Sequence, residues 1–238
     1  GLAWFLITRC DSVERQRMIV LIILTLSSVV FWALFEQSAA SMTLFADRVM
    51  DREVFGVTLT ASPYGALNSF FIFLFAPVFA LLWTVLGRRG LEPSTPVKFS
   101  LGIAQAGLGF GALVYGAQFP DQAGLVSAWW LILAYLLHTT GELCLSPVGL
   151  SAVTKLAVPS VVGVMMGTWF LASAYSSYVA AQIATIAARP ATAATLDRAG
   201  ALAGYTELFG QLLTIGLAGG AVLIVLSPIL KRLMHGVR

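Results

Sequence analysis

Charge is scarce in this sequence. Its 238 residues include 14 Lys and Arg and 11 Asp and Glu, so charged side chains make up 11% of the chain, against roughly 25% in an ordinary soluble domain. Apolar residues make up 58%. Because a soluble domain of this length needs charge around its whole surface, the composition excludes a soluble enzyme, a nucleic-acid-binding domain and a disordered chain.

Cysteine is rare as well, and the common catalytic motifs are absent. Cys10 and Cys144 alone provide neither a disulfide framework nor a metal pattern. The sequence has no Gly-rich phosphate loop ending in Lys-Ser/Thr, no zinc-binding His-Glu-x-x-His and no complete nucleophile elbow. We therefore expect no enzyme, no catalytic residue, no bound metal and no organic cofactor.

Long charge-free runs dominate the chain instead. A membrane-spanning helix needs ~20 predominantly apolar residues, so the runs predict an all-α, polytopic membrane protein with six transmembrane helices in one bundle over 17–238. Residues 1–16 are expected to form a cytoplasmic linker before it. The expected helices cover about 17–46, 62–87, 96–118, 125–156, 160–188 and 205–231.

The basic residues are distributed unevenly between the two sides of this bundle. If residue 1 is cytoplasmic, ten of the 14 Lys and Arg lie on the cytoplasmic side and four on the other. The positive-inside rule therefore places both ends of the chain in the cytoplasm. Gly-xxx-Gly pairs predict close helix contacts, within the bundle rather than between copies; they are Gly107/Gly111, Gly163/Gly167 and Gly216/Gly220.

Glu36 and Glu142 lie deep inside predicted spans. A charged side chain at the bilayer centre costs at least ~2.5–3.5 kcal/mol, and no Lys or Arg lies at mid-span in the sequence. Either both acids are protonated, or their cations belong to a part of the protein outside this chain. Acids in this setting are typical of functional, proton-exchanging sites; the alternative is a neutral, hydrogen-bonded structural Glu.

Polar and aromatic side chains share helix faces with these acids. Trp32 lies four residues before the first acid, and Ser146 lies four residues after the second. Asn68 is the only asparagine in the sequence, with Tyr64 on the same face. An amide in hydrocarbon needs a partner or a wet cavity, so Asn68 contacts either a neighbouring helix or a solute. Trp169, taken alone, is more typical of packing.

Four motifs, in order along the chain, carry a resemblance to a known family. Residues 141–157, GELCLSPVGLSAVTKLA, resemble the tenth helix of the proton-dependent oligopeptide transporter family, a branch of the major facilitator superfamily. FWALFEQ (31–37), followed by LFADR (44–48), resembles the seventh helix. APVFA (76–80) and MMGTWF (165–170) resemble the eighth and eleventh helices.

The resemblance implies that this chain is the C-terminal half, helices seven to twelve, of a twelve-helix carrier in the lipid bilayer of a bacterial inner membrane. Its partner is then an N-terminal six-helix half, its substrates are di- and tripeptides, and the proton is its coupling ion. Glu36 and Glu142 would couple transport to protons, Glu36 by pairing with an arginine of the other half. The implied substrate-binding residues are Glu142, Asn68, Ser146, Trp169, Trp32 and Tyr64.

Two alternatives stay open. A member of the same family could carry another solute, such as nitrate or a drug-like compound, although an intramembrane acid suited to an amine argues mildly against nitrate. The chain could also belong to a membrane sensor or scaffold that transports nothing.

Overall fold

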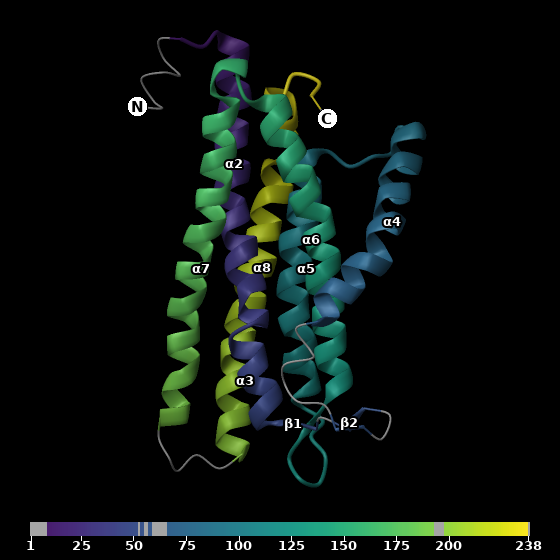
Figure 1. The fold of residues 1–238 in the computed structure, drawn as a ribbon, viewed down its shortest axis with the longest axis vertical. Helices are drawn as coiled ribbons and strands as arrows, with labels where there is room; N and C mark the ends of the chain where they lie inside the picture. The colour runs from purple at the N-terminus through teal and green to yellow at the C-terminus, as the bar shows by residue number, and fades with distance from the viewer. Residues whose placement is uncertain (1–8, 52, 55–56, 59–65, 193–197, 238) are drawn as a thin grey trace.

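The structure is a bundle of long helices that run side by side (Figure 1). A computed structural model describes residues 9–51, 53–54, 57–58, 66–192 and 198–237. The all-α class predicted from the sequence is confirmed. The long helices are α2 (Ser12–Phe35), α4 (Ala66–Arg88), α5 (Thr95–Gly116), α6 (Ala128–Leu156), α7 (Val162–Thr192) and α8 (Arg198–Leu233). The short pieces are η1 (Glu36–Ser38), α3 (Ser41–Arg48), η3 (Pro159–Val161), β1 (Met50–Asp51), β2 (Glu53–Val54), β3 (Val57–Thr58) and β4 (Val126–Ser127).

Five segments of the described chain are long and apolar enough to cross a membrane. They are Ser12–Arg48, Ala66–Arg88, Thr95–Gly116, Ala128–Leu156 and Arg198–Leu233. α7 is a further helix of 31 residues and packs along α2. The last helix begins at Arg198 rather than near residue 205, and residues 62–65 of the predicted second span lie outside the part that the structure describes.

The first long helix begins earlier than the charge pattern predicts. α2 starts at Ser12, inside the stretch 1–16 expected to be linker. Asp11 and Glu14 form a capping box: the Glu14 amide donates to Asp11 Oδ1 at 2.7 Å, and the Asp11 amide donates to Glu14 Oε2 at 3.1 Å. Such a box satisfies backbone donors that the helix leaves unpaired, so the helix can start before the apolar run does.

The largest departure from the predicted helices is a break in the first span. The sequence predicts one helix over 17–46, but α2 ends at Phe35, and η1 separates it from α3. The buried Gln37 side chain donates from Nε2 to the Ala180 carbonyl of α7 at 2.9 Å. The Tyr135 hydroxyl of α6 donates to the Ser38 carbonyl at 2.9 Å. The Ala180 carbonyl of α7 and the Tyr135 hydroxyl of α6 thus satisfy polar groups at the break, where an unpaired group in the membrane is costly.

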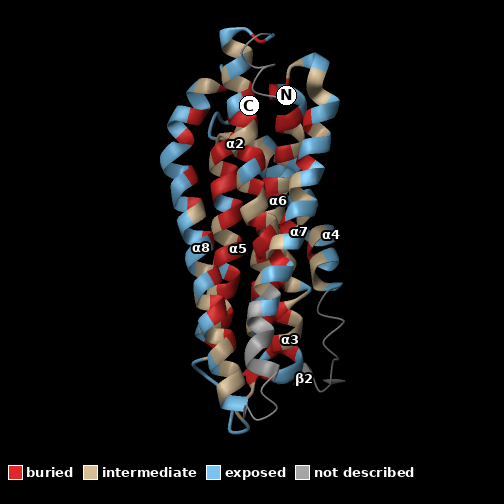
Figure 2. Cartoon of the chain, turned by 90° about the vertical axis from the view of Figure 1, so that its left-hand side faces the viewer, coloured by how far each residue is buried: buried red, intermediate tan, exposed pale blue. Residues whose placement is uncertain are grey.

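α5 lies at the centre of the packing, against α8, α6 and α2, and carries many of the buried residues in Figure 2. Its Gly107 lies against Gly216 of α8, so that a Cβ added to Gly107 would come within 2.9 Å of the Gly216 Cα. Backbones approach this closely only where side chains are absent. In contrast, a Cβ added to Gly163 or Gly167 of α7 would meet no atom of the described residues within 4 Å.

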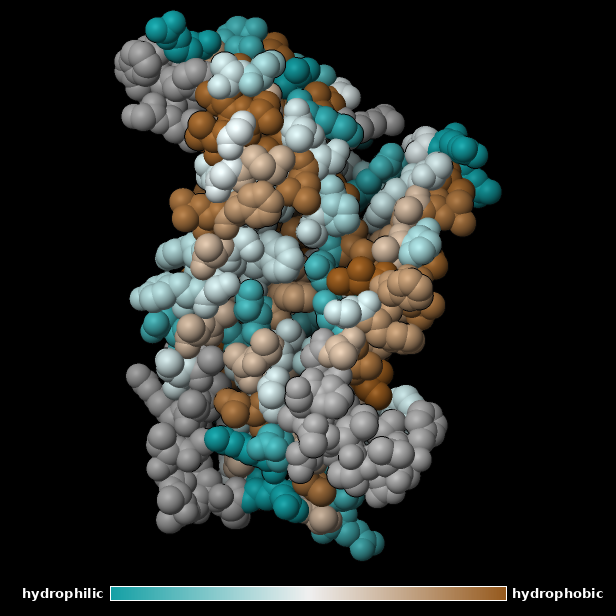
Figure 3. Space-filling view, viewed as in Figure 1, coloured by the Kyte–Doolittle hydropathy of each residue, from teal (hydrophilic) through white to brown (hydrophobic). Residues whose placement is uncertain are grey.

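α4 stands at the edge of the bundle. It packs mainly on α6 and inclines away from the other helices toward its C-terminal end (Figure 1). Only 6% of its most apolar window is buried, against 56% for α5. Pro77 lies inside α4, where it removes one backbone donor. Large apolar side chains such as Phe73, which is 83% exposed, cover its outer surface (Figure 3).

The start of α2 and the end of α8 lie at the same end of the bundle (Figure 1). Arg17 Nη2 donates to the His235 carbonyl at 3.5 Å, and the His235 ring lies 2.6 Å from Gln16 Oε1. At the opposite end, a short parallel pairing joins Met50 to Val126. The two connections tie together segments that are far apart in the sequence.

Candidate functional site

Glu142 and Asn68, both implied as substrate-binding residues by the family resemblance, are joined by a hydrogen bond. Glu142 lies in the middle of α6, and Asn68 lies in the first turn of α4. Asn68 Nδ2 donates to Glu142 Oε2 at 3.0 Å and to Thr139 Oγ1 at 3.1 Å. Thr139 in turn donates to the Tyr135 carbonyl at 2.8 Å. Both amide hydrogens of Asn68 are therefore used to hold it against one face of α6.

This arrangement leaves hydrogen-bond acceptors for a ligand. Among the described residues, the hydrogen bond to Glu142 uses its Oε2 atom, and the hydrogen bonds of the Asn68 side chain use its Nδ2 atom. The remaining Glu142 Oε1 and Asn68 Oδ1 are both acceptors, and both residues are only partly buried. A carboxylate oxygen and an amide oxygen on two hydrogen-bonded side chains suit an ammonium group, which carries only donors.

Glu36 is the first residue of η1, in the break between α2 and α3, and is held by α7. Ser177 Oγ of α7 donates to Glu36 Oε1 at 3.1 Å. The next residue, Gln37, binds the α7 backbone and also accepts from Ser41 Oγ at 2.5 Å. The break therefore orients the first acid toward α7, whereas the second acid is held by α4.

An aromatic cluster connects the two acid-bearing regions. Phe35, which precedes Glu36, has its ring centroid 6.1 Å from that of His138, one turn before Glu142 on α6. The His138 ring is fully buried and lies 4.9 Å from the Phe110 ring. This environment is that of a packing residue, and it holds the α2 and α6 sections of the site against each other.

Trp32 lies one turn before Glu36 and packs on its neighbours. Its ring centroid lies 5.3 Å from that of Phe31 and 5.4 Å from that of Phe35. Its indole Nε1 is buried and has no hydrogen-bond partner among the residues that the structure describes. A buried N–H donor is costly when unpaired, so this position suits a contact with a ligand or with a further part of the protein.

The other predicted binding residues lie in different surroundings. Ser146 is partly exposed, one turn after Glu142 on α6. Trp169 is 3% exposed; its ring lies against Gly149 of α6 and is 6.1 Å, edge to face, from the Phe99 ring of α5. In this conformation Trp169 joins α7 to α5 and α6. Tyr64 lies outside the described residues.

Sequence reasoning missed Thr139 and Gln37 as parts of the site. Thr139 lies three residues before Glu142, so helical spacing alone could have assigned it to the same face. Gln37 follows the first acid directly, but its role depends on α7, for which the local sequence gives no signal. Among the described residues, no group of three or more His, Cys, Asp or Glu could hold a metal ion.

Comparison with known proteins identifies relatives of this chain. A sequence model described as the POT family matches residues 3–202. An "Uncharacterized transporter YclF" of Bacillus subtilis is 40% identical over 96% of this chain and 43% of its own length. A "Dipeptide and tripeptide permease B" of Aeromonas hydrophila is 35% identical over 95% of this chain and 45% of its own length. The chain thus spans less than half the length of these relatives.

A solved structure shows the same fold. The crystal structure of a peptide transporter POT in complex with sulfate superposes with a TM-score of 0.83 at 34% identity, covering 99% of this chain and 45% of the other. This likeness confirms the prediction of one half of a major-facilitator-type carrier. The relatives are transporters and not enzymes, as the sequence predicts. The chain belongs to the POT family.

Proposed function

We propose that the protein containing this chain carries di- and tripeptides together with protons across a bacterial inner membrane. In this proposal the chain is the C-terminal half of the carrier, both of its ends are cytoplasmic, and a six-helix N-terminal half completes the transport path. Relatives named as dipeptide and tripeptide permeases support the substrate class.

The observation that carries the proposal is the hydrogen-bonded pair of Glu142 and Asn68. Its remaining acceptors, Glu142 Oε1 and Asn68 Oδ1, suit two of the three N–H donors of a peptide's amino terminus. A hydrogen bond to a charged group contributes about 1.5–3 kcal/mol. Trp32 and Ser146 would border the bound peptide, and Trp169 would approach it in a conformation in which α7 has moved away from Gly149.

Glu36 is the acid that we propose for proton coupling. It lies at mid-span, where a charge requires a partner, and Ser177 is a neutral hydroxyl that cannot compensate its charge. An arginine of the N-terminal half would form an ion pair with the deprotonated acid. Protonation would break this pair, and the two halves could then rock about the peptide bound between them. Glu142 can also take part in proton coupling, because its carboxylate can bind a proton when the peptide amine leaves.

Uptake of a labelled dipeptide by the complete carrier in proteoliposomes, under an imposed pH gradient, tests both roles. For Glu36→Gln we expect loss of gradient-driven uptake, since the side chain can no longer bind and release a proton. For Glu142→Gln we expect at least a tenfold loss of dipeptide affinity, in line with a charged hydrogen bond. Glu207→Gln, which changes an exposed acid of α8, is the matched control and should leave both quantities unchanged.

The same assay separates the alternatives. Unchanged gradient-driven uptake by Glu36→Gln would remove its proton role. Competition by nitrate or a drug-like compound, but not by peptides, would indicate another solute. Failure of the complete protein to accumulate any solute would favour a sensor or scaffold.

A further inference from the structure

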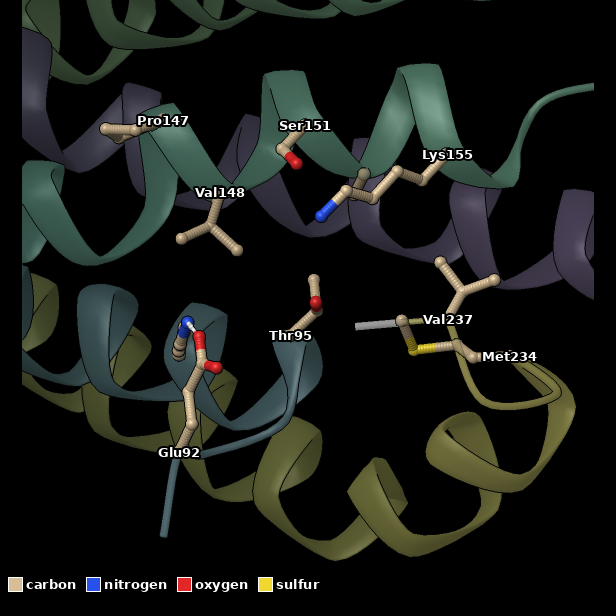
Figure 4. Close-up of a pocket in the computed structure, with 10 residues that line it drawn as sticks. Glu92, Thr95, Pro147, Val148, Ser151, Lys155, Met234 and Val237 are labelled. Carbon is tan, nitrogen blue, oxygen red and sulfur yellow. Dashed lines mark hydrogen bonds and ion pairs between the residues drawn. The ribbon is translucent and has the colours of Figure 1, made fainter. Parts of the chain in front are cut away.

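A cavity with charged walls lies away from Glu36 and Glu142. It has a volume of about 370 Å³ and is found at the end of the bundle where α2 begins and α8 ends (Figure 4). The α4–α5 connection, the first turn of α5, the last turns of α6 and the residues after α8 all line it. Its polar lining residues are Glu92, Thr95, Lys98, Ser151 and Lys155.

Two lysines give this cavity its charge. Lys98 is only 6% exposed; its Nζ lies 2.5 Å from Glu92 Oε1 and 4.5 Å from the centroid of the Trp83 ring. These contacts fix its ammonium group in place. Lys155, on the last turn of α6, directs its ammonium group into the cavity, between Ser151 and Thr95 (Figure 4).

The charges in the wall favour an anion. Among the lining residues that the structure describes, Glu92 is the one acid and Lys98 and Lys155 are the two bases, so the wall has a formal charge of +1. Thr95 and Ser151 add hydroxyl donors. Thr95 is also the first residue of α5, so the positive end of that helix adds to the field of the lysines.

The depth of the cavity and its apolar wall indicate the kind of anion. Thr95 begins one membrane-crossing helix and Lys155 lies in the last turn of another, so the cavity lies at the edge of the apolar layer, where phospholipid headgroups are found. Val148, Met234 and Val237 form an apolar part of the wall. A phosphate carried on an apolar molecule would satisfy both parts of the surface.

We propose that this cavity binds a phosphate group, either the headgroup of an anionic phospholipid or free phosphate, between Lys155, Ser151 and Thr95. The site is separate from the proposed peptide site, since Lys155 lies thirteen positions after Glu142 on α6, which corresponds to about 20 Å at 1.5 Å per residue. The proposal therefore stands whichever solute the carrier moves.

The test is a lipid titration of the complete carrier in neutral detergent. Binding of phosphatidylglycerol is followed by native mass spectrometry, with zwitterionic phosphatidylcholine as the reference lipid without net charge. Inorganic phosphate is compared with chloride at equal ionic strength. Lys155→Gln should weaken phosphatidylglycerol binding about fivefold, the effect of one lysine at an anionic headgroup. Lys231→Gln removes an exposed base at the same end of the bundle but outside the cavity, and should change binding by less than twofold.

Each outcome decides the proposal. Tighter binding of phosphatidylglycerol that depends on Lys155 supports a lipid site, whereas a Lys155-dependent shift of the melting temperature by inorganic phosphate alone supports a free phosphate site. Equal effects of Lys155→Gln and Lys231→Gln, or no response to either phosphate source, would overturn it. Lys155 is exposed, so Lys155→Gln should fold normally, which an unchanged melting temperature without ligand would verify.

Discussion

α5 and α4 are both long, apolar helices, but different interactions hold them. α5 is buried among α2, α6 and α8, with Gly102 against the backbone of α6 and Gly107 against that of α8. α4 packs mainly on α6 and contributes Asn68, whose polar contacts reach Glu142 and Thr139.

The difference between α5 and α4 indicates a division of roles. The central helices keep the bundle folded, while the edge helices α4 and α7 supply partners of the two acids through Asn68 and Ser177. Substitutions in the centre should therefore reduce stability, and polar substitutions at the edge should reduce transport.

The largest effect is expected where α5 meets α8. A Cβ at Gly216 would lie 2.8 Å from the backbone nitrogen of Gly107, and a backbone cannot give way as a flexible side chain can. Gly216→Ala should therefore destabilise the folded state by about 1–3 kcal/mol, as overpacking of a close contact does. The measurement is the melting temperature of the complete carrier in detergent.

Gly210, on the same helix, provides the matched control. An added Cβ there meets no atom of the described chain within 4 Å, so Gly210→Ala should leave the melting temperature close to that of the parent. If the two substitutions had equal effects, close packing of α5 on α8 would not be what stabilises the centre.

At the edge, Asn68→Ala should affect transport far more than stability. It removes the donor to Glu142 Oε2 and one acceptor proposed for the peptide amine. We expect about a tenfold loss of dipeptide affinity, the lower end of the range for charged hydrogen bonds, with little change in melting temperature because α4 is so exposed. Equilibrium binding of a labelled dipeptide to the complete carrier measures this loss.

The control on the same helix is Thr84→Ala. The Thr84 hydroxyl donates to the Ala80 carbonyl of its own helix at 2.8 Å, so its removal should leave the affinity unchanged. An Asn68→Ala carrier with normal affinity but a collapsed melting temperature would reverse the assigned roles, making Asn68 a structural contact.

The same contrast explains what the sequence could predict. The helices follow from charge-free runs because a membrane span depends on local composition alone. The break after Phe35 could not be predicted, since it depends on the contact of Gln37 with Ala180 and that of Tyr135 with Ser38, between residues far apart in the chain. For the same reason the sequence assigns intramembrane acids but not their partners.

Individual site residues show where this limit lies. The family resemblance implies both Asn68 and Glu142 as substrate-binding residues, and a hydrogen bond joins them. Thr139 could have been added from helical spacing. The burial of Trp169 could not be predicted from the sequence, because it depends on the absence of a side chain at Gly149 and on the position of Phe99. Only the packed structure brings these three residues together.

The smallest effect we predict is at Ser177, and it tests whether α7 belongs with the edge helices. Ser177→Ala removes the hydroxyl that donates to Glu36 Oε1. A single neutral donor contributes about 1 kcal/mol, so gradient-driven dipeptide uptake should fall about fivefold or less, with an unchanged melting temperature.

The control is the neighbouring Ser176, which donates to the Ser173 carbonyl of its own helix at 2.6 Å, so Ser176→Ala should leave uptake at the parental rate. If both variants transport at the parental rate, Ser177 has no part in the function of Glu36. The tie between Gln37 and Ala180 would then be the contact through which α7 acts on the break.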